Sequence, residues 1–482
     1  MISKNKYYVY NIYMVHKINK TIGGKAIASG GYGCVFSPAL QCDGSSKRQI
    51  GKISKLMTEK HAKKEYEEIT KFKEIVKDIP NYSDYFLLND ITICKPAKLS
   101  SSDLTDFNKK CKALPKDKIT KQNINNNLNK LLTINMPNGG KPVDDFIYDD
   151  GSFDKLYRVN DSLIDLFKNG IIPMNKKYIY HCDIKDSNIL VEEESQKKLV
   201  TRLIDWGLST EYKPFKNEPF PKTWRNRPLQ YNVPFSVIIF SDAFVYKYTE
   251  YIKNGGKIDK TSLKPFVINY LHFWIQERGS GHYKIINEII YILYSNELTT
   301  LKEEDKKQII ENDFTLVYIT DYIVDILIQY TKFRKDGSLN LREYLDNVFI
   351  ENVDVWGFCA CYFPYLEIFY NNYNKLVPNE IEIFDNVKTL FISLYTRGNE
   401  KINKENIFEN LQNLGNLIKS SIKYNNLDNS SASGIKIKNK NIKISNRKKI
   451  VKNISKVSFK KIPKSKTRKF KNLLLLSAKL KK

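Results

Sequence analysis

Long apolar segments are missing from this sequence of 482 residues. No run of about 18 apolar residues occurs, so the sequence predicts no membrane-spanning helix. The longest purely apolar run near the end, residues 473–476, is far too short to cross a bilayer. The first residues are mixed and polar, without the apolar core and small-residue cleavage site that a signal peptide carries.

Acidic residues are missing from the last part of the sequence. Residues 429–482 contain 19 Lys and Arg and no Asp or Glu. The formal net charge of the whole chain is +26, so this segment carries most of the excess and leaves +7 for the rest. Such a charge suits nucleic acid, an anionic membrane surface or acidic proteins as a partner. The alternative is a solvated tail without a partner.

A regular cysteine pattern is missing as well. The seven cysteines are odd in number and unevenly spaced, which argues against a disulfide framework and predicts a reducing, intracellular compartment. The only close pair, Cys359 and Cys361, lies in an apolar stretch. We therefore interpret both as core residues rather than as metal ligands.

The remaining sequence has the composition of a globular protein, with 41% hydrophobic and 12% aromatic residues. Its length allows two or three domains with a sizeable core. Short β-like runs alternate with one amphipathic helical stretch, residues 59–77, in the first third of the chain. These runs are residues 26–36, 49–56, 86–96 and 131–136. The later pattern is mostly helical, apart from short strands near residues 180–205, so the sequence predicts an α+β fold.

Shifts in composition predict the boundaries of the parts. These parts are a leader at 1–21, a β-rich region at 22–138, a helical region at 139–425 and a basic low-complexity tail at 426–482. A polar, Asn- and Lys-rich insertion at about 98–127 is expected to be a surface loop. A second insertion, at about 240–350, contains long helical patterns such as residues 283–294 but no motif.

A glycine-rich turn, "ASGGYGCVF", occupies residues 28–36, within the first of the β-like runs. Its glycines Gly30, Gly31 and Gly33 would let backbone N–H groups approach phosphate oxygens without Cβ clashes. By itself such a hairpin is more often a simple turn than a nucleotide site.

A lysine follows on the next strand-like run. Lys55 can reach the phosphates of a nucleotide held by the turn, with Lys52 as the alternative. A lysine in this role needs a carboxylate to fix its position. The following helix offers Glu65, with Glu68 as the alternative.

The stretch "YHCDIKDSNILV", residues 180–191, has the spacing of a phosphoryl-transfer loop. Asp183 can orient an attacking hydroxyl and accept its proton, Lys185 can neutralise charge on the transferred group, and Asn188 can hold a metal ion. Asp205, in "LIDWGLS", follows an apolar strand 17 residues after Asn188. That position suits a carboxylate on Mg²⁺ between two phosphates.

Asp354, in "VDVWGF", is an acidic residue inside an apolar helical run. A buried carboxylate must be hydrogen-bonded, and the predicted donors are backbone N–H groups of the loop at 180–191. The alternative is an aspartate at a helix end without such a role.

In this order the motifs resemble those of the eukaryotic-type protein kinases, over roughly residues 22–425. The resemblance implies a two-lobed fold, with an N-lobe at 22–138 that has one main helix and a larger helical C-lobe at 139–425, and binding of ATP and Mg²⁺. It implies that Asp183 is the catalytic base, that Lys185 is the lysine typical of Ser/Thr kinases, and that Asn188 and Asp205 are metal ligands. The other implied site residues are Ala28 (in place of the first glycine), Gly30, Gly31, Gly33 and Val35 over the phosphates, the pair Lys55 and Glu65, Asn135 and Met136 in the hinge, and His181 and Asp354 as structural residues.

Two departures concern the site itself. "INMPNGG", residues 134–140, resembles the hinge between lobes, but Pro137 falls where a backbone N–H usually meets adenine, so the base would lose one hydrogen bond. Cys182 stands where most such kinases carry an arginine that pairs with a phosphorylated loop residue. Cys182 cannot make that pair, yet in the family arrangement it touches neither ATP nor metal. The resemblance therefore implies an enzyme that is active without phosphorylation of the activation loop.

Other departures point to a divergent branch. No Ala-Pro-Glu motif follows "DWG", and "RPLQYNVPFS", residues 227–236, stands in its place, about 110 residues before "DVWG". These features and the basic tail resemble the kinases of large nucleocytoplasmic DNA viruses, of the mimivirus and iridovirus type. That likeness implies a location in the host cytoplasm or virion, or in the nucleus through the basic tail.

The sequence thus predicts a kinase that transfers the γ-phosphoryl group of ATP to Ser or Thr hydroxyls of protein substrates. The alternatives are a pseudokinase, a small-molecule kinase that shares the "HxDxxxxN" string, and a scaffold that binds nucleic acid or acidic partners through residues 429–482.

Overall fold

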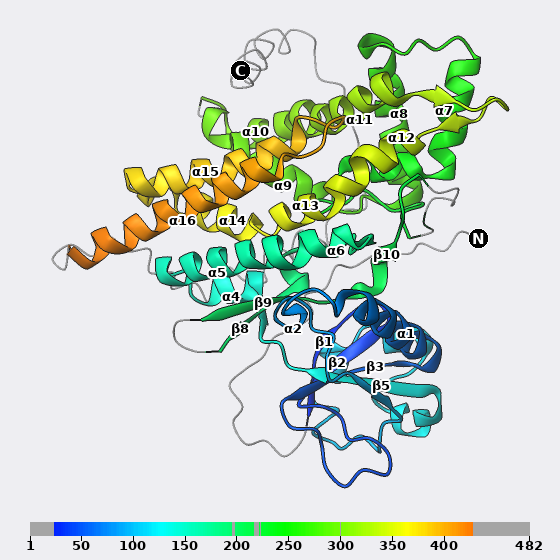
Figure 1. Cartoon of the computed structure of the whole chain (residues 1–482), viewed down its shortest axis with the longest axis vertical. Helices are drawn as coiled ribbons and strands as arrows, with labels where there is room; N and C mark the ends of the chain where they lie inside the picture. The colour runs from blue at the N-terminus through cyan, green and yellow to red at the C-terminus, as the bar shows by residue number, and fades with distance from the viewer. Residues whose placement is uncertain (1–23, 195–197, 216–220, 222, 299, 428–482) are drawn as a thin grey trace. The chain divides into compact units, whose positions relative to one another are not determined.

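The computed structural model describes residues 24–194, 198–215, 221, 223–298 and 300–427 (Figure 1). These residues form an α+β protein, as the sequence predicts. All of them belong to the first of the two units into which the chain divides, which ends at Ile437. The predicted leader at 1–21 and the tail from residue 428 onward lie outside the described residues.

The first third of the described chain builds a five-stranded antiparallel sheet in the order β1-β2-β3-β5-β4. Its strands are β1 (Lys25–Ser29), β2 (Gly33–Ser37), β3 (Lys52–Thr58), β4 (Thr92–Cys94) and β5 (Leu131–Pro137). Each of the four β-like runs predicted from the sequence overlaps at least one of these strands. The turn between β1 and β2 is the glycine-rich stretch, so the sheet places it beside the lysine-bearing strand β3.

One long helix, α1 (Glu59–Val76), packs along β3 and β5 (Figure 1). The sequence predicts it at residues 59–77, and its buried side chains are Ala62, Ile69, Phe72 and Val76. These positions recur every three or four residues, which puts them on one face of the helix. The helix begins directly after β3, so the two elements that carry Lys55 and its candidate partners are joined without a loop.

The insertion at 98–127 is not the surface loop that its Asn and Lys content predicts. It folds into the short helical segments α3 (Phe107–Lys110), η1 (Leu114–Asp117) and η2 (Ile124–Asn126), and η3 (Leu128–Lys130) follows it. Another short helix, α2 (Tyr82–Tyr85), lies earlier in the chain. Phe107, Leu114 and Ile124 are fully buried and share a core cluster with Phe36 and Leu56 of the sheet. A few apolar side chains spaced among polar ones are enough to bury one face of the segment.

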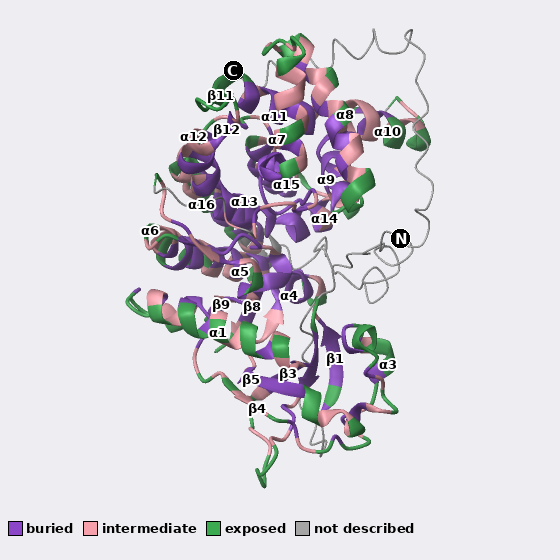
Figure 2. Cartoon of the chain, turned by 90° about the vertical axis from the view of Figure 1, so that its right-hand side faces the viewer, coloured by how far each residue is buried: buried purple, intermediate pink, exposed green. Residues whose placement is uncertain are grey.

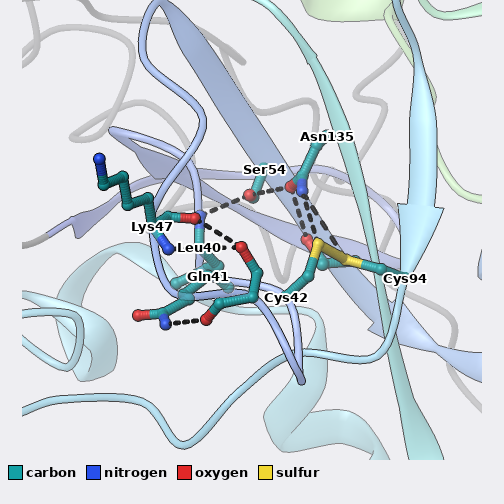
Figure 3. The surroundings of a disulfide bond; sticks show 9 residues. Leu40, Gln41, Cys42, Lys47, Ser54, Cys94 and Asn135 are labelled. Carbon is teal, nitrogen blue, oxygen red and sulfur yellow. Dashed lines mark hydrogen bonds between the residues drawn. A yellow bond between two sulfur atoms is a disulfide. The ribbon is translucent and has the colours of Figure 1, made fainter.

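The prediction that the cysteines are unpaired is wrong for four of the seven. Disulfides join Cys34 to Cys111 and Cys42 to Cys94. Figure 3 shows the second of them beside Asn135, whose side-chain nitrogen donates to Cys42 Sγ at 3.3 Å. The partners are 77 and 52 residues apart, so no local spacing reveals them. Cysteine usage therefore no longer supports a reducing compartment.

We expect loss of either disulfide to lower the free energy of unfolding by about 2–4 kcal/mol, because each closes a long loop in the unfolded chain. The double variants Cys34→Ser/Cys111→Ser and Cys42→Ser/Cys94→Ser test this by denaturant unfolding with and without reductant. Reductant should destabilise the wild type more than either variant. Titration of the unreduced, denatured chain should find the three thiols that the structure leaves free, and seven would contradict the pairing.

Helices account for most of residues 143–427. They are α4 (Val143–Asp149), α5 (Phe153–Asp165), α6 (Ile172–Lys176), α7 (Asp242–Lys253), α8 (Lys260–Arg278), α9 (Tyr283–Tyr294), α10 (Glu303–Ile309), α11 (Leu316–Tyr330), α12 (Arg342–Tyr344), α13 (Ile350–Ala360), α14 (Phe363–Asn371), α15 (Pro378–Tyr395) and α16 (Lys404–Leu427). Shorter 3₁₀- or π-helical segments lie among them: η4 (Leu166–Ile171), η5 (Asp186–Asn188), η6 (Trp206–Leu208), η7 (Phe235–Phe240), η8 (Ser295–Leu298), η9 (Ile310–Thr315), η10 (Leu345–Phe349) and η11 (Tyr373–Lys375). The predicted helix at 283–294 coincides with α9. Among the described residues, no helix has the length and apolar character that a membrane crossing requires.

All residues of helix α13 except Glu351 are buried, and its ribbon in Figure 2 is purple. Cys359 in α13 and Cys361 directly after it are unpaired and fully buried. Their prediction as core residues is confirmed.

Short strands near residue 190 connect the sheet to the helices. The hairpin of β8 (Ile189–Glu193) and β9 (Leu199–Leu203) pairs with β6 (Lys141–Pro142), and β7 (Ile179–Tyr180) pairs with β10 (Thr210–Glu211). A further pair, β11 (Lys332–Phe333) and β12 (Leu339–Asn340), lies in the second insertion. Leu190 and Ile204 belong to the same apolar cluster as Val35 and Met136 of the sheet. This shared core brings the hairpin and its following loop against β3.

Candidate active site

Asp183 lies in the loop between β7 and β8, with only 6% of its surface exposed. Its carboxylate accepts hydrogen bonds from Lys185 Nζ at 2.7 Å, Asn188 Nδ2 at 3.0 Å and Asn232 Nδ2 at 2.9 Å. Asn188 Nδ2 also donates to the carbonyl oxygen of Asp183 at 2.8 Å. The three residues that the sequence singled out in this loop therefore meet at one carboxylate, whose direction is fixed by donors on both oxygens.

The charges at this carboxylate stabilise one another. Burial disfavours the charged form of Asp183, but the neighbouring cations Lys185 and Arg227 outweigh it and lower the pKa of Asp183 to about 2. Burial likewise opposes the charge of Lys185, and Asp183 outweighs it and raises the pKa of Lys185. Asp183 is thus an anion near neutral pH. Because so acidic a group is a weak base, it suits the orientation of a hydroxyl more than its early deprotonation.

Asp205 lies two residues after the end of β9, in the left-handed backbone region at φ +63°. The N–H of the preceding Ile204 donates to the carbonyl oxygen of Asn188 at 3.0 Å, which places Asp205 and Asn188 at the same end of the β8–β9 hairpin. His181 is buried, which lowers its pKa, and its Nε2 lies 3.0 Å from the carbonyl oxygen of Ile204. A neutral His181 therefore holds the backbone just before Asp205, which agrees with the structural role predicted for it.

Lys55 forms an ion pair with Glu65, with Nζ at 2.6 and 2.7 Å from the two carboxylate oxygens. The two alternatives are occupied elsewhere. Lys52 Nζ donates to the carbonyl oxygen of Asp90 at 2.6 Å, and Glu68 lies 3.5 Å from Lys64. The structure therefore selects Lys55 and Glu65 as the pair, whose part in nucleotide binding remains a prediction.

A cavity brings this pair together with the loop after β9. Its lining includes Lys55, Glu65, Met136, Asp205 and Trp206. Residues from four separate parts of the sequence, namely β3, α1, the end of β5 and the "DWG" turn, thus face one space. This is the juxtaposition that the order of the motifs predicts.

The glycine-rich turn closes the β1–β2 hairpin, where the N–H of Gly30 donates to the carbonyl oxygen of Gly33 at 2.9 Å. A Cβ on Gly33 would lie 2.3 Å from the side chain of Met57, so the close approach of β2 to β3 requires glycine there. Ala28 and Val35 pair across the hairpin and are buried in the apolar cluster that also contains Met136. At Gly31 the space beside the backbone is open.

The hinge stretch offers few hydrogen-bond donors. Asn135 does not face the cavity, because its side chain is held at the Cys42–Cys94 disulfide on the other face of the sheet from Lys55 (Figure 3). Met136 does line the cavity. Pro137 has no N–H, and the N–H of Asn138 already donates to the carbonyl oxygen of Gly51 at 3.0 Å. A base bound here would rely on apolar contacts and carbonyl groups.

Asp354 of α13 makes the contacts predicted for it. It is buried, and it accepts hydrogen bonds from the backbone N–H groups of His181 at 2.9 Å and Cys182 at 2.8 Å and from Asn175 Nδ2 at 2.7 Å. Gly357, one turn later, lets the helix approach, since a Cβ there would lie 2.7 Å from the carbonyl oxygen of Ile184. Helix α13 therefore fixes the backbone of the loop that carries Asp183.

Sequence reasoning missed three residues of the site, all between positions 224 and 232. Asn232 donates to Asp183, Arg227 Nη1 donates to the carbonyl oxygen of Cys182 at 2.8 Å, and Trp224 Nε1 donates to Cys182 Sγ at 2.9 Å. For Arg227 and Asn232 the only signal was a polar side chain inside the apolar stretch "RPLQYNVPFS", which carries no helical or strand period, and Trp224 lies outside that stretch.

Comparisons with known proteins add nothing to this picture, because no protein-family model and no curated protein matches the chain.

Proposed function

We propose that the protein is an ATP-dependent protein kinase that transfers the γ-phosphoryl group to Ser or Thr hydroxyls. One observation carries the proposal: the Lys55–Glu65 pair and Asp205 line one cavity, and Asp205 is tied through Ile204 to Asn188 beside Asp183. Phosphoryl transfer needs little covalent chemistry from the protein. It needs cations on the phosphates, ligands for Mg²⁺ and an oriented hydroxyl.

The proposal extends to the fold. The five-stranded sheet with α1 would be the N-lobe, residues 22–138, and the helical region at 139–425 the C-lobe of a eukaryotic-type protein kinase. The order of the motifs along the chain and the shared apolar cluster between sheet and hairpin support this assignment. The likeness to kinases of large nucleocytoplasmic DNA viruses, and a location in host cytoplasm, virion or nucleus, belong to the same proposal.

The residues present fit Mg²⁺, which prefers oxygen ligands and keeps several of them from water and substrate phosphates. Within the described residues the carboxylate of Asp205 has no hydrogen-bond or ion-pair partner, and Asn188 uses its nitrogen toward Asp183 and so keeps its oxygen as a ligand. No group of three or more His, Cys, Asp or Glu in the described ranges could hold a metal, so phosphate oxygens would complete the coordination. When bound, the ion would neutralise charge between the β- and γ-phosphates.

The side chains of the chain then divide the work. Lys55, fixed by Glu65, would hold the phosphates under the turn at Gly30 and Gly33. Asp183 would orient the hydroxyl in line with the transferred group, and Lys185 would neutralise the negative charge that gathers on that group. Catalysis would thus rest on positioning and on electrostatic stabilisation.

The test is transfer of label from γ-labelled ATP by the full-length protein. Acceptors are peptides that offer Ser, Thr or Tyr, a basic protein, the protein itself and small alcohols. We expect label on Ser and Thr that requires Mg²⁺ and disappears with a chelator. Transfer to small alcohols alone would replace the proposal by a small-molecule kinase. A folded protein that labels no acceptor would be a pseudokinase.

A further inference from the structure

Arg227 is a buried cation beside the catalytic loop, with 6% of its surface exposed. Its Nη1 donates to the carbonyl oxygen of Cys182 at 2.8 Å, and its Nε donates to Gln230 Oε1 at 2.6 Å. Its Nη2 has no hydrogen-bond partner in the described residues and lies 3.9 Å from Asp183 Oδ1. The guanidinium thus faces both the carbonyl oxygen of Cys182 and the carboxylate of Asp183. Burying a charge is costly without such partners, so this placement is specific.

Cys182 is the residue that Arg227 holds. Its backbone has φ +60°, a conformation that residues other than glycine rarely adopt and that the surrounding contacts must therefore stabilise. Three groups hold it: Asp354 accepts from its N–H, Arg227 donates to its carbonyl oxygen, and Trp224 Nε1 donates to its sulfur. The small side chain of Cys182 leaves room for Trp224, which is fully buried. An arginine at position 182 would have to displace that indole.

The segment that contains Arg227 contacts the loop at further points. Asn232 Nδ2 donates to Asp183 Oδ1 at 2.9 Å and to the carbonyl oxygen of Ile184 at 3.2 Å. The hydroxyl of Tyr231 donates to Asp186 Oδ1 at 3.1 Å. Residues 224–232 therefore lie against the loop from Cys182 to Asp186 and fix its carboxylate directly.

The second insertion, which has no motif in its sequence, holds this segment in turn. Trp274 of α8 donates from Nε1 to the carbonyl oxygen of Arg227 at 3.0 Å, and the N–H of His282 donates to the carbonyl oxygen of Leu229 at 2.9 Å. Burial lowers the pKa of His282 to about 3, so its neutral Nδ1 can accept the N–H of Tyr231 at 3.4 Å. At Gly281, φ is +53° and a Cβ would lie 2.3 Å from the Leu229 oxygen. The insertion thus anchors the backbone around Arg227.

Loop hydroxyls are poorly placed to act as a switch. Ser209 is buried and its Oγ donates to the carbonyl oxygen of His181 at 3.3 Å, and Thr223 Oγ1 is buried as well. Thr210 is half-buried and pairs with Tyr180 in the small β7–β10 sheet. A phosphoryl group on Ser209 or Thr223 would have to open the contacts around the catalytic loop.

We propose that Arg227 is a positioning residue that holds Cys182 and Asp183 in their active arrangement, in place of the phosphorylated loop residue that most such kinases use, and that α8 and the Gly281–His282 turn keep it there. This inference rests on the proposed kinase function and adds its regulation. The active arrangement is then part of the fold. The insertion at 240–350 acts as an internal support rather than as an appendage.

The test compares Arg227→Met, Arg227→Lys and the control Arg225→Met in the full-length protein. Arg225 lies two residues away in the same segment and is half-buried, but in the described residues no hydrogen bond or ion pair joins it to the catalytic loop. We expect Arg227→Met to lower kcat by about 100-fold with little change in the KM for ATP, because the phosphate site is untouched. Arg227→Lys should recover part of the loss, to within roughly 10-fold of wild type, since it keeps the charge but not the fork of donors. Arg225→Met should match wild type.

Other results would overturn either the proposed function or the role of Arg227 alone. A wild type without transfer to any acceptor removes the proposed function and this inference with it. An active wild type beside Arg227 variants of unchanged kcat removes the inference alone. So does a loss that only follows the unfolded fraction, measured by circular dichroism on the same samples. If Arg227→Met does not fold, Arg227→Lys decides by its kcat. Finally, the variant Ser209→Ala/Thr210→Ala/Thr223→Ala should keep turnover within a few-fold of wild type, and background turnover of the folded variant would overturn the inference.

Discussion

Replacement of Asp183 by Asn should lower kcat by about 10²- to 10⁴-fold while ATP still binds. Asn has nearly the same shape as Asp, so the loop can keep its path. The Asn side chain, however, lacks the negative charge that would orient a substrate hydroxyl and accept its proton. The carboxylate now receives donors from Lys185, Asn188 and Asn232, and its pKa of about 2 keeps it ionised. Removal of that charge also leaves Lys185 without the anion that raises its pKa.

Two further variants are measured beside Asp183→Asn: one that should weaken nucleotide binding and one that should behave as wild type. Asp205→Ala should also abolish turnover, but through weaker Mg²⁺-dependent binding of the nucleotide, because Asp205 lines the cavity together with Lys55 and Glu65. Asp161→Asn changes an exposed carboxylate on α5 and should behave as wild type. Nucleotide binding is measured by calorimetry with a non-hydrolysable analogue, with and without Mg²⁺. Unchanged turnover in Asp183→Asn would remove Asp183 from the mechanism.

Local periodicity makes Lys55 and Glu65 candidates for the pair, although the sequence leaves Lys52 and Glu68 open as alternatives. Alternation along β3 puts Lys55 on the same face as Ile53 and Met57, whose side chains are buried, and puts Lys52, the first residue of the strand, on the other face. Glu65 lies three residues after buried Ala62 and four before buried Ile69, so it shares the inner face of α1. In a regular strand or helix, the spacing of residues determines which side chains share a face, and the structure contains the Lys55–Glu65 pair.

Arg227, Asn232 and the disulfides could not be predicted in the same way. Arg227 and Asn232 reach partners 45 and 49 residues away, from a segment without periodic secondary structure. The Cys34–Cys111 disulfide depends on how the insertion at 98–127 folds back on the sheet. The Asn and Lys content of that insertion hides the few apolar residues that bury it. Long-range contacts of irregular segments produce no periodic pattern in the sequence. The contacts of Arg227 and Asn232 with the loop that carries Asp183 are therefore evident only from the structure.

Replacement of Asp354 by Ala should lower the free energy of unfolding by about 3–5 kcal/mol, because it leaves buried donors without an acceptor. The donors are the N–H groups of His181 and Cys182 and the amide of Asn175. Each unpaired buried donor costs on the order of 1–3 kcal/mol. Cys182 adds a further cost, since its backbone at φ +60° needs these bonds to stay in place. Urea unfolding followed by circular dichroism measures the change.

Two matched variants separate this effect from a general one. Asp354→Asn keeps the shape and one acceptor oxygen, so it should fall between wild type and Asp354→Ala. Asp385→Ala removes an exposed carboxylate of α15, 3.8 Å from Lys388, and should change the free energy of unfolding by less than about 0.5 kcal/mol. In Asp354→Ala that remains folded, kcat should also fall, because the loop bearing Asp183 loses its support from α13. A stable variant with unchanged kcat would mean that Arg227 and Trp224 alone suffice to hold Cys182, and that α13 only packs beside the site.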